Sequence, residues 1–228
     1  MKTLILLTVL VTGCAPLPGP KGPACITYAP LRNIGNIGPV VTDIESHLPA
    51  SHPYRDRDLV TWVHEGSHGI AGQLRNLYHC PGFYVLRDRA VLLQEPNTTL
   101  SAVAARVPAS LRGRGYNLYL IQQQHYFQDQ PTYILDEWVA YTNGSEARAR
   151  LSLQARGETV ESMMEFIPYA LCLPMDPQLK AFVRWQIERA VRLGRVPDAL
   201  QTSPDAESLR QSTRKCFGTN WTLRVLGF

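Results

Sequence analysis

The feature that most constrains the fold of this chain is the apolar pattern of residues 58–77. Apolar side chains recur there at three- and four-residue intervals, which is the spacing of a helix that buries one face. They are Leu59, Trp62, Val63, Ile70, Leu74 and Leu77. Asp56 and Asp58 suit the positively polarised N-terminal end of such a helix. The pattern therefore predicts one long, largely buried helix over residues 58–77.

Three glycines inside this predicted helix need an explanation. Gly66, Gly69 and Gly72 fall within seven residues, and each costs about 1 kcal/mol relative to alanine in a helix interior. We expect this cost to be offset by the close approach of another element, or of a substrate, to the helix.

The same helix carries two histidines and a glutamate whose spacing suits metal chemistry. His64 and His68 are four residues apart, so both rings lie on one face of a helix and can reach the same ion. The segment resembles the HExxH motif of zinc metallopeptidases, the zincins. The resemblance implies that His64 and His68 bind Zn²⁺ and that Glu65 is the catalytic general base. The alternative is a buried amphipathic helix with two incidental histidines.

A catalytic zinc takes three protein ligands and keeps one position open. Ala71 and Leu74 stand where the metzincin subclass needs glycine and histidine, which excludes that subclass. In gluzincins the third ligand is a glutamate on a separate downstream helix, and the resemblance implies Glu137 in this role. Glu137 lies in the apolar segment 133–141, where a buried carboxylate needs a partner. The alternative is a solvated helix face bearing Asp136 and Glu137. Weaker candidates for the third ligand are Glu146, Glu161, Glu165, His79 and His125.

Two supporting roles stay open at the level of sequence. Gluzincins usually carry an acidic residue one turn after the ligand glutamate, but Tyr141 stands at that position here. The partner for the outer nitrogen of a ligand histidine is therefore Asp136, Asn76 or a backbone carbonyl. The candidate donors to the oxyanion of the reaction are Tyr141, Tyr133 and His125, and Tyr141 is the one included in the expected site.

The start of the chain indicates export from the cytoplasm. Lys2 supplies a short basic region, and residues 3–12 are apolar but too few to span a bilayer. Residues 11–14 resemble the lipobox of bacterial lipoproteins. The resemblance implies a signal peptide over residues 1–13 and a lipid anchor on Cys14. The alternative is an ordinary cleaved secretory signal in which the cysteine is incidental.

The lipobox resemblance also implies where the protein resides. Ala15 replaces the aspartate that usually signals retention in the inner membrane, so we expect an outer-membrane lipoprotein that faces the periplasm. Residues 14–24 are rich in proline and glycine and are predicted to form an extended tether. Residues 25–228 then form one domain, because their number suits a single core and their composition is ordinary for a globular protein.

The remaining cysteines fit an oxidising compartment. Four are left once Cys14 is assigned to the lipid, and an even number outside the cytoplasm predicts two disulfide bonds. Three pairings are open among them. They are Cys25, Cys80, Cys172 and Cys216.

Strand and helix signals elsewhere predict an α+β domain in which helices dominate. Residues 83–86 and 90–93 are apolar and flank a charged turn at residues 87–89, which predicts a β-hairpin beside the metal-binding helix. By resemblance to zincins, the edge of that small sheet pairs with an extended peptide substrate. Further helices are predicted over residues 100–107, 134–153, 160–171 and 177–193.

These observations lead to one expected function and two alternatives. The net charge of +4 is too small and dispersed to indicate a nucleic-acid partner. We expect a zinc-dependent hydrolase that cleaves peptide bonds of peptide or protein substrates in the cell envelope. The alternatives are a non-catalytic zinc-binding lipoprotein and an amidase that acts on peptidoglycan.

Overall fold

The fold is described from a computed structural model. It covers residues 24–27, 39–50, 52, 58–151, 160–194 and 201–227. The predicted signal peptide, residues 1–13, and residues 14–23 of the predicted tether lie outside this range. Among the described helices, none combines the length and the apolar character needed to cross a membrane.

The predicted long helix forms as α2, Leu59–Tyr78, and its first residue is set by a side-chain cap. The Asp58 carboxylate accepts hydrogen bonds from the Val60 amide at 3.0 Å and from the Thr61 hydroxyl at 2.9 Å, which satisfies donors that a helix start leaves unpaired. The helix ends where His79 adopts a left-handed conformation, with φ 53°. Leu77 is 52% exposed in the last turn, so the prediction that it is buried was wrong: the buried stripe ends at Leu74, which packs against β2.

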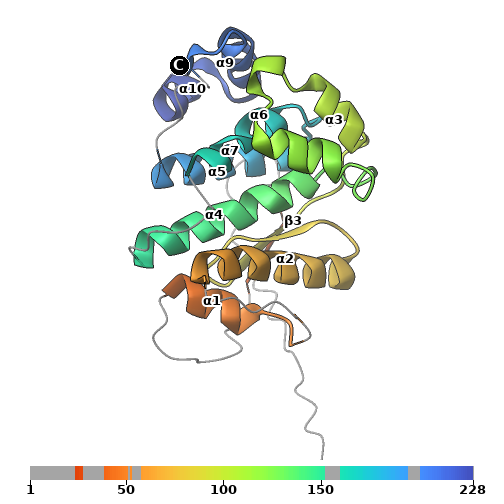
Figure 1. Cartoon of the computed structure of the whole chain (residues 1–228), viewed down its shortest axis with the longest axis vertical. Coiled ribbons are helices and arrows are strands. Elements are labelled where there is room, and N and C mark those ends of the chain that lie inside the picture. Colours follow the sequence, from red (N-terminus) through yellow and green to blue (C-terminus); the bar gives the residue numbers. More distant parts are fainter. Residues whose placement is uncertain are drawn as a thin grey trace, which may run out of the picture.

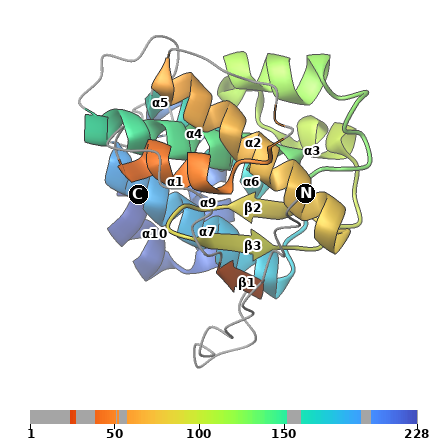
Figure 2. The ribbon, with the colours of Figure 1, turned by 90° about the horizontal axis from the view of Figure 1, so that it is seen from below.

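The predicted β-hairpin is present beside α2. Strands β2, Gly82–Tyr84, and β3, Arg89–Leu92, pair in antiparallel register. A further strand, β1, Ala24–Thr27, pairs with the other edge of β3 and gives the order β1-β3-β2 (Figure 2). The sequence did not indicate β1, because four residues after a proline-rich segment carry little periodicity.

Helices supply the rest of the described structure, and they lie in successive layers (Figure 1). Helix α1, Pro39–His47, packs on α2, which in turn packs on α4, Tyr133–Leu151. Helix α7, Pro177–Leu193, covers the far side of α4. The shorter elements are α3 Leu100–Arg106, η1 Ala109–Leu111, η2 Tyr116–Gln122, α5 Val160–Met164, α6 Phe166–Leu171, α9 Ala206–Phe217 and α10 Thr219–Leu226. This arrangement confirms an α+β fold in which helices dominate.

One predicted helix is divided in the structure. Residues 160–171 were expected to be continuous, but α5 ends at Met164 and α6 begins at Phe166. Pro168 has no amide hydrogen to donate to the carbonyl four residues earlier, so it weakens the helix at this place. Glu165 in the break turns inward, and its carboxylate accepts a hydrogen bond from the Gly115 amide at 2.8 Å.

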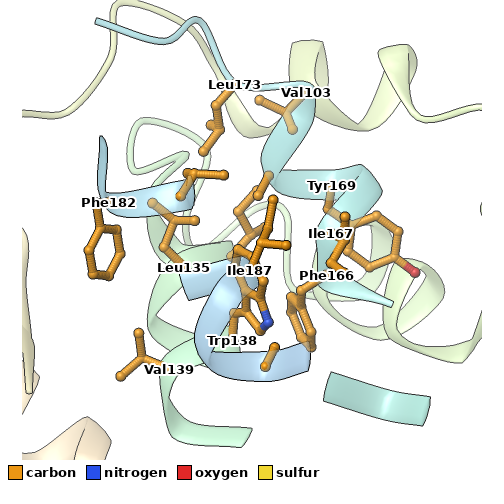
Figure 3. Packing of buried hydrophobic residues seen from close by; sticks show 14 of the residues in the cluster. Val103, Leu135, Trp138, Val139, Phe166, Ile167, Tyr169, Leu173, Phe182 and Ile187 are labelled. Atoms are coloured by element: carbon orange, nitrogen blue, oxygen red, sulfur yellow. The ribbon is translucent and has the colours of Figure 1, made fainter. Parts of the chain in front are cut away.

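The main core lies between α4, α6 and α7. Trp138 of α4 is fully buried among Phe166 of α6 and Ile187 of α7 (Figure 3). A second apolar cluster joins α1 to α2 and the hairpin, and it includes Ile44, Val63 and Tyr84. Helix α2 is therefore held between two packed layers, which fixes the face that carries the histidines.

A buried hydrogen-bond network fixes α4 against α2 and the sheet. The Asn143 side-chain amide of α4 donates to the Ser67 hydroxyl at 2.8 Å and to the Tyr84 carbonyl at 3.0 Å. Arg189 of α7 donates to the Asn143 carbonyl oxygen at 2.6 Å and to the Glu146 carboxylate at 3.1 Å. Buried polar groups of this kind are stable only when paired, so the network admits one register of α2 against α4.

The three helix glycines differ in what surrounds them. A Cβ on Gly66 would lie 2.6 Å from Cγ2 of Ile44, and one on Gly69 would lie 2.5 Å from the His52 ring. No described atom lies within 4 Å of a Cβ on Gly72. Close packing therefore explains Gly66 and Gly69 as predicted, whereas Gly72 has no packing reason among the described residues.

This difference predicts opposite effects of alanine at two positions of one helix. Gly66→Ala forces a buried methyl against α1 and should lower the free energy of unfolding by about 1–2 kcal/mol, because overpacking outweighs the gain in helix propensity. Gly72→Ala is the matched control and should raise it by about 0.5–1 kcal/mol. Urea denaturation followed by circular dichroism measures both. Equal shifts for the two variants would contradict the packing of α1 on α2.

Candidate metal centre

Helices α2 and α4 bring three side chains with metal-ligand atoms to one point. His64 and His68 project from the same face of α2, and their Nε2 atoms lie 3.1 Å apart. Glu137 projects from α4, and its Oε2 atom lies 3.6 Å from Nε2 of His64 and 3.5 Å from Nε2 of His68. The three side chains expected to share a metal are therefore brought together, although Glu137 is 69 residues beyond His68 in the chain.

The spacing of these atoms suits a divalent metal ion. Bonds of 2.0–2.1 Å in a tetrahedral site place neighbouring ligand atoms about 3.3–3.4 Å apart, and the three observed separations bracket that value. Oε2 of Glu137 is buried and accepts no hydrogen bond within the described residues. A buried carboxylate oxygen is costly without a partner, so this atom is placed for a cation. The residues fit the group, and His64, His68 and Glu137 could hold a metal ion.

Asp136 orients one of the two histidines. Its Oδ2 atom lies 2.9 Å from Nδ1 of His68, on the side of the ring opposite the cluster. A carboxylate at this position holds the proton on Nδ1, which leaves the lone pair of Nε2 directed at the point shared with Glu137. Of the partners that the sequence left open, the structure places Asp136 beside His68, whereas Asn76 is exposed further along α2.

Tyr133 orients Glu137 from one turn earlier on α4. Its hydroxyl donates to Oε1 of Glu137 at 2.7 Å and also contacts the side-chain amide of Gln123. Because Oε1 is occupied by this hydrogen bond, Oε2 alone faces the histidines. The arrangement favours binding of a cation through a single oxygen of the carboxylate.

The electrostatic environment makes Glu137 strongly acidic and His68 strongly basic. Burial alone would raise the pKa of Glu137, but His68 and His64 outweigh it and hold that pKa well below its usual range. Burial alone would lower the pKa of His68, but Asp136 and Glu137 outweigh it and raise that pKa well above its usual value. The cluster thus carries net negative potential, which a bound cation or a proton on His68 neutralises.

Glu65 and Tyr141, the two residues expected to act in catalysis, both adjoin His64, one in sequence and one through a ring contact. Glu65 follows His64 on α2, is half-buried, and makes no hydrogen bond or ion pair within the described part of the chain. The ring of Tyr141 meets the ring of His64 edge-on, with centroids 4.6 Å apart. Its hydroxyl lies 2.7 Å from the hydroxyl of Tyr119.

The weaker candidates for a third ligand are engaged elsewhere. Glu146 pairs with Arg189 at 3.1 Å, and Glu165 accepts from the Gly115 amide. His79 caps the far end of α2, three turns from His68, and His125 is exposed with its ring against Tyr126. The side chain of the remaining candidate, Glu161, lies outside the described residues.

Sequence reasoning missed the contribution of η2, the π-helical segment Tyr116–Gln122. Tyr119 in this segment and Gln123 just after it reach the two tyrosines of α4 that flank Glu137. π-helical turns are frequent at functional sites, but the sequence of residues 116–123 does not predict such a turn. Only the tertiary contact identifies Tyr119 and Gln123.

A second group of possible ligands lies at the tip of the hairpin. Asp43 and His47 of α1 and Asp88 of the turn have ligand atoms within 4.8 Å of one another. Both oxygens of Asp43 already accept hydrogen bonds, one from the Tyr84 hydroxyl at 2.7 Å and one from the Arg87 amide at 2.7 Å. Leu86, Arg87 and Asp88 all have positive φ values, so we interpret this group as the support of a strained turn.

The described cysteines do not test the predicted disulfides. Cys80, Cys172 and Cys216 are free thiols, and the side chain of Cys25 lies outside the described residues. The two disulfide bonds therefore stay a prediction.

Known proteins give no independent guide to this centre. Comparison of the chain with protein-family models, with curated proteins and with solved structures finds no significant match. The assignment of the centre depends on its geometry and on the sequence pattern.

The contact between Asp136 and His68 generates a prediction about metal affinity. Asp136→Asn keeps the shape of the side chain but removes its charge. It should weaken the binding of an added divalent metal ion, with Zn²⁺ as the probe, about 10–100-fold, which is the cost of losing an outer carboxylate in known metal sites. Competition with a fluorescent chelator measures the affinity. Asp129→Asn removes one exposed charge nearby in the sequence and should leave the affinity unchanged. Equal affinities for the two variants would contradict an orienting role for Asp136.

Proposed function

We propose that this protein is a zinc-dependent hydrolase that cleaves peptide bonds, related in its site to the gluzincin type of zincin. The observation that carries the proposal is the convergence of Glu137 with His64 and His68. One carboxylate oxygen and two imidazole nitrogens lie 3.1–3.6 Å from one another, and the ligand set is that of catalytic zinc sites with two histidines and one glutamate.

A bound zinc ion and the side chains of the protein would contribute different parts of the reaction. A zinc ion bound here would supply a Lewis acid that makes water acidic enough to ionise near neutral pH. Glu65 adjoins His64 on α2, and we assign it the role of accepting the proton of the attacking water. It then returns that proton to the departing amine as the peptide bond breaks. A half-buried carboxylate without a competing hydrogen bond among the described residues suits both tasks.

The number of ligands supports a catalytic site over a structural one. A structural zinc site is usually closed by four protein ligands, whereas a catalytic one keeps a position for water or substrate. Within the described residues, the group around His64 offers three. The side chain of His68 is 22% exposed, but that of Glu137 is 8% exposed. The site therefore opens to solvent on the side of His68, and we propose that substrate approaches from there.

Tyr141 is the proposed donor to the oxyanion. Of the three candidates, Tyr133 already donates its hydroxyl proton to Glu137. His125 is exposed, and its ring lies against Tyr126 with centroids 3.7 Å apart. The ring of Tyr141 lies against the ring of His64, with centroids 4.6 Å apart, so we assign the contact with the oxyanion to its hydroxyl. A tyrosine hydroxyl carries one proton that it can donate to an oxyanion.

The site of action follows from the start of the chain. The lipobox-like residues 11–14 support attachment to the outer membrane through lipid on Cys14, with residues 15–23 as a tether. We therefore propose that the hydrolase acts on peptides or proteins of the periplasm and the cell envelope.

Replacement of the general base tests the mechanism. Glu65→Gln keeps the side-chain volume but cannot accept a proton, so hydrolysis of casein should fall about 10²–10⁴-fold while zinc content stays at the level of the unaltered protein. His68→Ala should lose both zinc and activity. Metal analysis and a casein digestion assay measure the two properties.

A control uses a histidine outside the cluster. His79→Asn retains a residue that tolerates the left-handed conformation at the end of α2, so zinc and activity should both be preserved. Turnover of Glu65→Gln at the unaltered rate would contradict the mechanism. Digestion of purified sacculi in place of casein would assign the same chemistry to a peptidoglycan amidase, and a zinc with four protein ligands would indicate a structural role.

A further inference from the structure

Helix α4 presents three residues at four-residue intervals to the metal cluster. Tyr133, Glu137 and Tyr141 lie one turn apart, so their side chains share one face of the helix. The middle residue is the proposed ligand. The hydroxyl of Tyr133 donates to it, and the ring of Tyr141 lies against the other proposed ligand His64. The positions of the Tyr133 and Tyr141 hydroxyls depend on the residues that contact them.

Segment η2 and the residue that directly follows it contact the two tyrosines. Gln123 contacts the hydroxyl of Tyr133, and the hydroxyl of Tyr119 lies 2.7 Å from that of Tyr141. Tyr119 and Gln123 are themselves four residues apart, so the two segments meet at two matched points on either side of Glu137. The start of η2 is fixed in turn by Glu165, which accepts from the Gly115 amide.

One hydrogen bond of 2.7 Å joins the hydroxyls of the two tyrosines. A hydroxyl donates one proton and accepts through two lone pairs, so either tyrosine can be the donor. In both directions the contact ties the position of the Tyr141 hydroxyl to that of Tyr119.

Packing holds Tyr119 rigidly in this position. Its side chain is buried, and its ring lies against Phe166 with centroids 5.6 Å apart and against Tyr133 with centroids 6.2 Å apart. Tyr141 is less buried and contacts the edge of the His64 ring. The buried tyrosine thus acts as a fixed support for the more exposed one.

We infer that Tyr119 is a positioning residue that holds the hydroxyl of Tyr141 in place beside the metal cluster. With its hydroxyl held in place, Tyr141 can meet the oxyanion of the substrate in the role proposed above. This inference rests on the proposed function for its catalytic consequence. The placement of Tyr141 by Tyr119 can be tested without it.

The kinetic test uses a substitution that removes one hydroxyl. Tyr119→Phe retains the ring contacts and should lower kcat for a casein-derived peptide roughly tenfold with KM nearly unchanged, because misplaced donors cost transition-state stabilisation. Tyr141→Phe should lower kcat further. The double variant should match Tyr141→Phe, because Tyr119 acts through Tyr141 and the two effects are not additive.

Tyr116→Phe is the matched control. Tyr116 lies three residues earlier in η2 and is also buried, but its hydroxyl donates to the Ala104 carbonyl, away from the cluster. Its loss should leave kcat unchanged. Unaltered kcat in Tyr119→Phe, or losses that multiply in the double variant, would overturn the inference.

A second measurement is independent of activity and of zinc. Protein labelled with 3-fluorotyrosine gives a ¹⁹F resonance for Tyr141, which its absence in Tyr141→Phe identifies. We expect that resonance to shift and broaden in Tyr119→Phe and to stay unchanged in Tyr116→Phe. An unchanged resonance in Tyr119→Phe overturns the inference whether or not the protein hydrolyses peptides. Absence of hydrolysis by the unaltered protein, with the resonance shifted, contradicts the proposed function and leaves the positioning of Tyr141 supported.

Discussion

The crossing of α2 and α4 is the constraint on which the site depends, and Asn143 fixes it. The Asn143 amide donates to Ser67, the residue directly before His68, and to the backbone of β2. A slip of α4 by one turn would move Glu137 about 5.4 Å along the helix axis and leave a buried amide unpaired. Arg189 completes the network from α7; burial lowers its pKa to about 10, which still leaves it charged at neutral pH. Packing of apolar residues holds the helices together, and this polar network selects their register.

The charged groups of the centre are costly to bury, and their arrangement shows how the fold tolerates them. Glu137 lies in a helix segment whose neighbours, Leu135 and Trp138, belong to the main core. Its carboxylate is stabilised on one oxygen by Tyr133 and on the other by the positive charge that the histidines or a metal ion provide. Removal of that positive charge would leave a buried, uncompensated oxygen. The packing of the core buries this oxygen, and that burial favours a bound cation at the site.

Sequence reasoning succeeded where local pattern decides structure, and failed where distant contacts decide it. The apolar stripe predicted α2, and the apolar surroundings of Glu137 identified the side chain that meets the histidines 69 residues away. The hairpin was predicted from its charged turn. By contrast, β1 forms through pairing with β3, and the roles of Tyr119 and Gln123 exist only because η2 packs against α4. No periodicity in residues 116–123 could reveal that contact.

The adjacent acids of α4 differ from the arrangement that the resemblance to gluzincins implies. That pattern places an acidic residue one turn after the ligand glutamate, whereas here the position holds Tyr141 and the extra acid, Asp136, directly precedes Glu137. Successive helix residues point about 100° apart, so Glu137 reaches the inner nitrogens of both histidines while Asp136 reaches the outer nitrogen of His68. Asp136 thus supplies the carboxylate beside the outer nitrogen of His68, and Tyr141 stands one turn after Glu137. The ring of Tyr141 lies against His64 and its hydroxyl contacts that of Tyr119, so this position links the histidines of α2 to η2 where the gluzincin arrangement would have a second acid.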